Sequence, residues 1–329
     1  MIDGHGDDTH RYEDIHSNFS SNILPRTDLP GLEQHLRTHL HLIRTYPEPS
    51  ATTLETLIAE THNIHPDEVL VTSGATDAIH LIAQTFRHNP TYKTFPPTFS
   101  EYQDACQQMG YRQSHKAALC WLCNPNNPTG QTHPLHHIQT LAAQHPLLIL
   151  DQSYETYTLA PMLTPHQALQ TGNIIQLHSM TKQYSIPGLR LGYVTAPAPL
   201  IRQLRQHYRP WAVNALALQA GKWLLHNATP HIPNLTAHLR ETQRLRTRLA
   251  QLPGIHLPDA ATQTPFFLCT IHPHTAAALK HYLATQHHIL IRDASNFRGL
   301  TPHHFRLAAQ SPEENDTLIA ALTQYIQQA

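Results

Sequence analysis

The sequence predicts an α/β protein with a large domain around a mainly parallel, doubly wound sheet and a smaller α+β domain. Short apolar runs typical of strands alternate with helical patterns up to about residue 210, as in sheets whose strands are joined by helices. After Pro210 the pattern changes to long helices. The 329 residues also exceed the ~250 to 300 at which single cores stop growing. We therefore expect an N-terminal arm over 1–30, a large domain over 31–212 and a small domain over 213–329.

The N-terminal part of the chain predicts an irregular arm and then two helices. Residues 1–30 lack helical periodicity and contain Pro25 and Pro30. Apolar residues recur at helical spacing over 32–43, and this helix should end before the segment Tyr-Pro-Glu-Pro at 46–49. A second helix is expected over 53–61.

The next segment predicts a strand that leads directly into a helix. The strand covers 68–71, and Ser73-Gly74-Ala75-Thr76-Asp77 opens a helix with an apolar face that extends to Phe86. Further strands are expected over 119–123, 147–150, 174–177 and 191–194. Beyond Pro210 the pattern predicts helices over 215–225 and 235–252, strands over 266–271 and 288–292, and a last helix from about 312.

Composition favours a small-molecule partner. Lys and Arg total 22 against 23 Asp and Glu, so the formal net charge of −1 offers no basic field for a nucleic acid. The first residues have neither the positive charge nor the apolar core of a signal peptide. No apolar run approaches the ~20 residues that span a bilayer. We expect a soluble, cytoplasmic protein that binds neither nucleic acid nor membrane.

The cysteines and histidines do not predict a metal site. Cys120 and Cys123 form C-x-x-C, but residues three apart on a strand point to opposite faces, so we expect two buried, inert thiols. The 29 histidines include no H-E-x-x-H pattern and stand mostly in polar segments. We expect them at the surface, where they would add positive charge below about pH 6.5.

A candidate reactive lysine follows one of the predicted strands. Ser179-Met180-Thr181-Lys182 comes directly after the strand 174–177, and Arg190 follows shortly. A lysine held near hydroxyls and an arginine can lose its proton and attack an aldehyde. The hydroxyl of Ser179 and the guanidinium of Arg190 suit a dianionic phosphate. By itself S-x-x-K is equally compatible with a solvated lysine.

Two more polar segments follow neighbouring predicted strands. Asn-Pro-Asn-Asn-Pro-Thr-Gly at 124–130 comes after the strand 119–123, and Asp-Gln-Ser-Tyr at 151–154 comes after the strand 147–150. Open α/β sheets bind ligands at the carboxyl ends of their strands. Asp151 could there pair with a pyridinium N–H, and Asn127 and Tyr154 could donate to a phenolic oxygen. Taken singly, these segments are also compatible with a turn and a helix N-cap.

Together these motifs resemble those of the fold-type I aminotransferase superfamily of class I and II, which uses pyridoxal 5′-phosphate (PLP). The similarity extends over nearly the whole chain and implies the fold of the type I PLP-dependent transferases. It implies that Lys182 is the Schiff-base lysine, that Asp151 pairs with the pyridine nitrogen, and that Asn127 and Tyr154 bind the ring hydroxyl. The ligands it implies for the cofactor phosphate are Gly74, Ala75, Thr76, Ser179 and Arg190.

The resemblance also assigns two aromatic residues. Phe99 matches the aromatic side chain that stacks on the cofactor ring, although its pattern is equally compatible with core packing. Tyr46 matches a residue that reaches the cofactor phosphate of the neighbouring subunit. A homodimer with shared active sites is therefore implied.

Within the superfamily, the chain resembles the branch of histidinol-phosphate aminotransferases and the threonine-phosphate decarboxylases of cobalamin synthesis. The segments that favour the decarboxylases lie around His5, Gly6 and Asn22 and around Arg292 and Arg306. The first three are candidate substrate ligands. Arg306 is the candidate for the substrate carboxylate and Arg292, ahead of Arg298, for the substrate phosphate.

One departure from the decarboxylase pattern bears on the substrate. Asp7 and Asp8 replace its Gly-Asn, and they would repel a phosphate unless they point away. Decarboxylation of L-threonine O-3-phosphate is the preferred reaction, and amino transfer is the alternative because the same residues serve both. A non-catalytic PLP-fold scaffold or sensor is a third reading. It predicts damaged cofactor motifs, which the sequence does not have.

Overall fold

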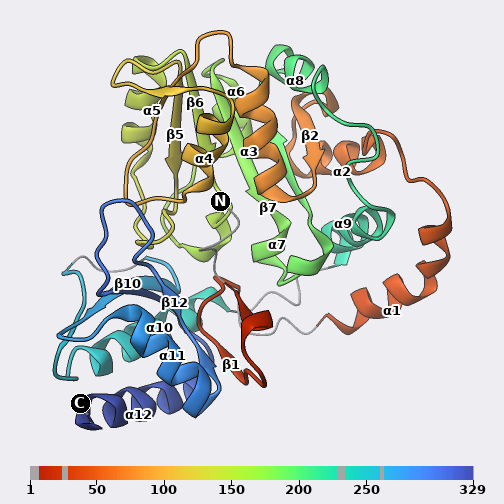
Figure 1. The fold of residues 1–329 in the computed structure, drawn as a ribbon. Helices are drawn as coiled ribbons and strands as arrows, with labels where there is room; N and C mark the ends of the chain where they lie inside the picture. The colour runs from red at the N-terminus through yellow and green to blue at the C-terminus, as the bar shows by residue number, and fades with distance from the viewer. Residues whose placement is uncertain (1–6, 24–28, 228–233, 260–262, 329) are drawn as a thin grey trace.

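The computed structural model describes residues 7–23, 29–227, 234–259 and 263–328. Two domains lie one above the other in Figure 1, and the N-terminal arm runs between them. This arrangement confirms the predicted α/β fold. Among the described residues, no helix combines the length and the apolar character that crossing a bilayer requires.

The large domain is built on a seven-stranded sheet in the order β2-β8-β7-β6-β5-β3-β4. The strands along that order are Val69–Thr72, Gly192–Thr195, Ile174–Ser179, Leu147–Asp151, Leu119–Cys123, Thr91–Lys93 and Arg112–Gln113. Strand β8 runs opposite to the other six, so its pairs with β2 and β7 are antiparallel and the remaining pairs are parallel. Because Cys123 pairs with Asp151 and Ser179 with Gly192, the ends of β5, β6 and β7 and the start of β8 meet at one edge.

Helices cover both faces of this sheet, as the alternation along β5 requires. Leu119, Trp121 and Cys123 pack in one apolar cluster, whereas Cys120 and Leu122 pack in another. The first cluster includes α3 (Gly74–Thr85), α4 (Glu101–Gln108) and α8 (Ala198–Arg205), and the second includes α5 (Leu135–Gln144) and α6 (Pro165–Leu169). The expectation of two buried cysteines on opposite faces is confirmed. Burial raises the pKa of the Cys120 thiol to about 12, which keeps it protonated.

The helix predicted over 32–43 is shorter in the structure. Helix α1 covers Pro30–Thr38, and a separate 3-10 helix, η2 (Leu40–Arg44), follows it. Leu40 is 50% exposed and Ile43 67% exposed, because no described part of this chain covers that end. The regular spacing of these apolar residues therefore marks an exposed apolar surface, and not one continuous helix that faces the core.

Helix α9 (Ala215–Asn227) packs in the large domain, although the sequence pattern placed it at the start of the small one. Its residues share an apolar cluster with α2 (Thr52–His62) and with β2. A Cβ on Gly221 would stand 2.7 Å from Leu54 Cδ2, so the two helices touch closely. After α9, the next helix, α10 (Leu235–Leu249), packs in the small-domain core.

The small domain contains a four-stranded antiparallel sheet in the order β12-β13-β10-β9. These strands are Arg292–Asp293, His304–Ala308, Phe266–Ile271 and Ile255–His256, and the helices beside them are α10, α11 (Ala276–His287) and α12 (Pro312–Gln328). The strand predicted over 288–292 is divided, because β11 (Ile289–Leu290) leaves this sheet. It pairs in parallel with β1 (Ser17–Asn18) of the arm. The described part of the arm is therefore ordered against the small domain, with Phe19 fully buried in its core.

Candidate active site

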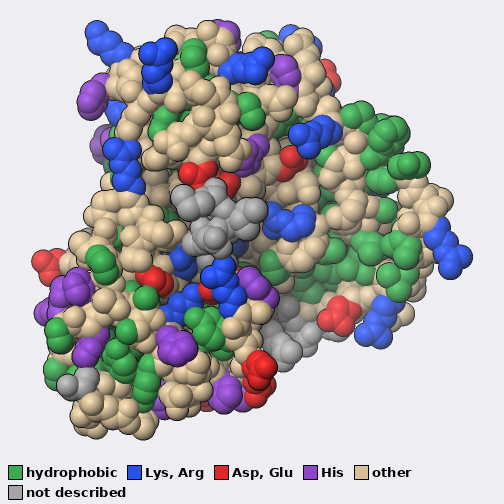
Figure 2. Space-filling view, in the orientation of Figure 1, with side chains coloured by type: hydrophobic (Ala, Val, Ile, Leu, Met, Phe, Trp, Pro, Cys, Tyr) green, Lys and Arg blue, Asp and Glu red, His purple; other side chains and the backbone are tan. Residues whose placement is uncertain are grey.

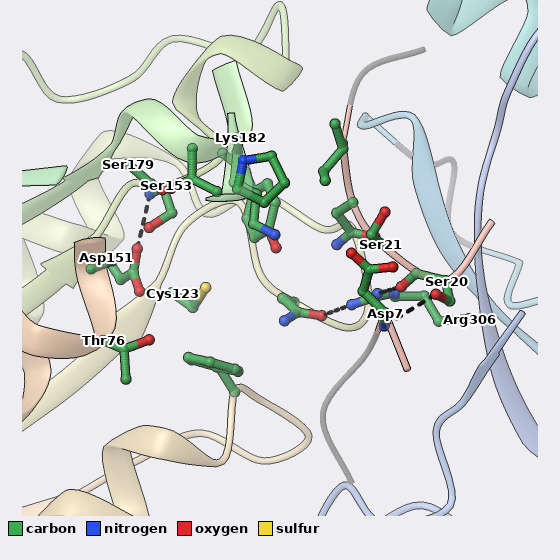
Figure 3. A pocket seen from close by; sticks show the side chains of 18 of the residues that line it. Asp7, Ser20, Ser21, Thr76, Cys123, Asp151, Ser153, Ser179, Lys182 and Arg306 are labelled. Atoms are coloured by element: carbon green, nitrogen blue, oxygen red, sulfur yellow. Dashed lines mark hydrogen bonds between the residues drawn. The ribbon is translucent and has the colours of Figure 1, made fainter. Parts of the chain in front are cut away.

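A cavity of about 260 Å³ lies at the carboxyl edge of the large sheet. Figure 3 shows Lys182, Ser179, Asp151 and Thr76 on one side, with Ser20, Ser21 and Arg306 on the other. The first group comes from the large domain and the second from the arm and β13. The predicted residues that line the cavity are Asn22, Ala75, Thr76, Phe99, Asn127, Asp151, Tyr154, Ser179, Lys182, Arg190 and Arg306.

Lys182 stands in the short helix α7 (Met180–Gln183), directly after β7. Enclosure by protein lowers the pKa of its amine to about 8, and the positive charges of Arg306 and Arg190 act in the same direction. The carboxylate of Asp7 opposes them. A substantial fraction of the amine is therefore neutral near pH 8, as attack on an aldehyde requires.

Tyr157 ties the backbone at Lys182 to the arm. Its hydroxyl lies 2.7 Å from the carbonyl oxygen of Lys182 and 3.1 Å from that of Asn22, and it donates to these acceptors. The side chain is buried at the end of the 3-10 helix η4 (Glu155–Tyr157). The position of the lysine thus depends on a contact between segments far apart in the chain.

Asp151 is the last residue of β6, and its buried carboxylate accepts two hydrogen bonds. The hydroxyl of Tyr102 donates to Oδ2 at 2.6 Å, and the backbone N–H of Ser153 donates to Oδ1 at 2.9 Å. Burial, and then the charge of Asp151, raise the pKa of Tyr102 well above its usual value, so Tyr102 stays a donor. Sequence reasoning missed Tyr102. The available signal was its place at the start of α4, three residues after Phe99, which the resemblance assigns to the cofactor ring.

An anion site forms where β2 leads into α3. Gly74 has φ +81°, which glycine adopts without strain, and a Cβ there would stand 2.6 Å from Arg190 Nη2, so the guanidinium would have to move. Gly192 is equally constrained, since its Cβ would approach Ala75 N to 3.1 Å. The first backbone N–H groups of α3 therefore lie close to Arg190 and Ser179. Free N–H groups at a helix N-terminus, a hydroxyl and a guanidinium are the donors that a phosphate dianion needs.

Arg306 is the buried cation on the opposite wall. One of its terminal nitrogens donates to Asn127 Oδ1 and the other to the carbonyl oxygen of Ser20. Its Nε is buried and makes no hydrogen bond with the described residues. Burial lowers its pKa to about 10, with Tyr154 acting in the opposite direction, so the group stays charged at neutral pH. A buried guanidinium that lines the cavity is suited to a carboxylate.

Tyr154 and Phe99 complete the wall around the position predicted for the cofactor ring. Burial raises the pKa of Tyr154 to about 12, while the positive charge of Arg306 acts against that rise. Tyr154 therefore remains a neutral donor. Phe99 contacts Tyr102 edge to face at 5.7 Å between ring centroids.

Four other predicted residues do not line this cavity. Gly74 lies just behind the wall formed by Ala75 and Thr76. Arg292 is buried, donates to Asn296 Oδ1 at 2.8 Å and lies over the ring of Phe297. Arg298 donates to Gln113, and Tyr46 is 84% exposed beside Trp211. His5 and Gly6 lie outside the described residues.

The two acidic residues of the arm point in different directions. Asp8 forms an ion pair with Lys280 at 2.5 Å, away from the cavity. Asp7 lines the cavity, and Asn18 donates to its carboxylate at 2.7 Å. Its φ of +64° is the conformation in which glycine, the residue of the decarboxylase pattern, has no steric cost. One negative charge therefore remains beside the site.

The sequence model of the aminotransferase class I and II family matches residues 111–322. A threonine-phosphate decarboxylase of Salmonella typhimurium is 30% identical, over 92% of this chain and 89% of its own length. A histidinol-phosphate aminotransferase of Xylella fastidiosa is 27% identical, over 85% of this chain and 84% of its own. The crystal structure of L-threonine-O-3-phosphate decarboxylase from Porphyromonas gingivalis has a TM-score of 0.90 and 35% identity, covering 94% of this chain and 99% of that one.

These similarities agree with the donors around the cavity. An enclosed lysine, a carboxylate at the end of β6, and an anion site at the start of α3 fit the aldehyde, ring nitrogen and phosphate of PLP. The chain belongs to the class I and II aminotransferase family, and pyridoxal 5′-phosphate is its cofactor.

Proposed function

We propose that this protein decarboxylates L-threonine O-3-phosphate in the cytoplasm, as a step of cobalamin synthesis. The observation that carries the proposal is Arg306, a buried guanidinium that lines the same cavity as Lys182 from the opposite wall. It offers a site for the carboxylate of an amino acid opposite the reactive amine. Two relatives at 30% and 35% identity are named threonine-phosphate decarboxylases, which favours this reaction over amino transfer.

The residues of the cavity have distinct tasks in this proposal. Bound PLP withdraws the electrons released at the substrate Cα. Arg306 holds the substrate carboxylate, and the bond that breaks is the one kept perpendicular to the cofactor ring. Lys182 would bind the cofactor aldehyde through Nζ and, after CO₂ has left, return a proton to Cα.

Arg292 is the proposed ligand of the substrate phosphate. It stands directly opposite Arg306 across the β12–β13 pair, so both side chains leave the same face of the sheet. Its guanidinium now contacts Asn296 and would turn from it to reach a phosphate next to the carboxylate. Asn22 of the arm, which lines the cavity, is proposed to close this end of the site.

The alternative function is amino transfer, for which the same lysine would remove the Cα proton. Histidinol-phosphate aminotransferases at 27% and 26% identity support it. The purified enzyme, supplied with L-threonine O-3-phosphate, is expected to release CO₂ without any 2-oxo acid. Strict dependence on a 2-oxo acid, with histidinol phosphate as amino donor, would instead establish the alternative.

We further propose that the enzyme is a homodimer in which Tyr46 reaches the partner's cofactor phosphate. Figure 2 shows hydrophobic side chains gathered on the side where α1, α2 and α9 lie. Leu40, Ile43, Tyr46 and Trp211 are each about half exposed or more, which is costly for apolar groups without a partner. Sedimentation should give a dimer that Ile43→Lys dissociates. Leu159→Lys, at a leucine with 65% exposure elsewhere, is the matched control. A monomeric wild-type protein would contradict the proposal.

A further inference from the structure

Two histidines and an aspartate meet where the N-terminal arm joins the small domain. Asp14 and His16 belong to the arm, and His288 follows α11. The potential ligand atoms of these three residues, the His-Asp cluster, lie within 4.8 Å of one another. Asp14 Oδ2 is 3.1 Å from His16 Nε2 and 4.0 Å from His288 Nδ1, so the carboxylate lies near both rings.

The backbone holds the His-Asp cluster in place. The N–H groups of His16 and Ser17 both donate to the carbonyl oxygen of His288, at 2.9 and 3.3 Å, and the β1–β11 pairing begins at the next residues. The imidazole rings of His16 and His288 stack at 4.8 Å. Ring Nδ1 of His288 is shielded from water and makes no hydrogen bond with the described residues, which is unusual for a polar atom.

We propose that the His-Asp cluster binds a divalent transition-metal ion of the zinc class. Two imidazole nitrogens and one carboxylate oxygen are ligands that Zn²⁺ prefers, and the exposed side leaves room for water as the fourth. Ligand atoms about 2.1 Å from a tetrahedral ion stand about 3.4 Å apart. The observed distances of 3.1 and 4.0 Å from Asp14 Oδ2 to the two ring nitrogens lie on either side of that value.

Such an ion would fasten the arm to the small domain. The arm continues from His16 to Ser20, Ser21 and Asn22 in the cavity wall, and Arg306 donates to the carbonyl of Ser20. A metal bridge between His16 and His288 would oppose separation of β1 from β11 and keep these residues at the site. Its role is structural and does not depend on the reaction the enzyme catalyses.

The test must separate this site from the other surface histidines, several of which lie on the small domain in Figure 2. The holoenzyme is freed of metal with a chelator and titrated with Zn²⁺ against a chromophoric competitor. Asp14→Asn, His16→Gln and His288→Asn each remove one ligand. Asparagine suits positions 14 and 288 because their φ values are +58° and +57°. His10→Gln, at an exposed arm histidine outside the His-Asp cluster, is the control.

The wild-type protein and His10→Gln should bind one Zn²⁺ at least about tenfold more tightly than any of the three variants, because each variant loses a direct ligand. Zn²⁺ should also slow proteolytic cleavage of the arm severalfold in the wild type. The three variants should show no such protection. Unchanged melting temperatures without metal establish that the variants are folded. Equal affinities in the wild type and the three variants, or a loss matched by His10→Gln, would overturn the proposal.

Discussion

Replacing Tyr102 by phenylalanine tests how the buried carboxylate of Asp151 is kept charged. The change removes one hydroxyl and leaves the ring packed at 5.2 Å against Trp121. The lost hydrogen bond is short, 2.6 Å, fully buried and made to a charged acceptor. Bonds of this kind contribute about 1.5 to 3 kcal/mol, whereas the bond from Ser153 N to the other oxygen remains.

We expect the loss of this hydrogen bond to weaken the interaction between Asp151 and the cofactor's ring nitrogen. A less stable carboxylate takes the shared proton more readily, and the ring then withdraws electrons less strongly. At about 1.4 kcal/mol per factor of ten, kcat should fall about 10- to 100-fold at saturating cofactor. The affinity for PLP, measured by absorbance titration, should weaken in the same variant.

Tyr111→Phe provides the matched control for this experiment. Tyr111 is also buried and donates its hydroxyl to a backbone carbonyl, that of Ala83, at 2.9 Å. This variant should lose about 1 kcal/mol of unfolding free energy and keep wild-type kcat. If Tyr102→Phe likewise keeps wild-type kcat and PLP affinity, Tyr102 only fills space and the reasoning is refuted.

Three further predictions follow from the cavity. The rate at which the apoenzyme attaches PLP, followed by stopped-flow absorbance, should rise with pH through about 8, because only the neutral amine of Lys182 reacts; a midpoint near the ordinary lysine value would contradict this. Gly74→Ala should weaken PLP binding at least about tenfold, since its methyl group collides with Arg190. Gly110→Ala is the matched control, because Gly110 has a similar φ of +79° and a Cβ there would meet no atom within 4 Å. Equal PLP affinities in these two variants would contradict the steric argument. Arg306→Lys should raise KM for L-threonine O-3-phosphate about 10- to 100-fold, because an ammonium cannot bind a carboxylate through two parallel hydrogen bonds; an unchanged KM would place the carboxylate elsewhere.

Local sequence patterns predicted the central strands of the large sheet and the residues that follow them, but not the strands β3, β4 and β13. Both β5 and β10 have the predicted bounds, Asp151 ends β6, and Lys182 follows β7, the next strand along the chain, as expected. Strand formation and the polar residues at a strand end depend on neighbours a few positions away, so periodicity reveals them. The family motifs then identified the cofactor.

The sequence by itself therefore determined the α/β class, the central strands of the large sheet and the chemistry gathered at their ends. Only the tertiary structure decided which domain α9 joins, that Tyr102 donates to Asp151, and that the arm brings Asp14 and His16 to His288. Each of these contacts joins residues far apart in the chain. No local pattern encodes such a contact, because its stability comes from long-range packing that also offsets the entropy of closing a long loop.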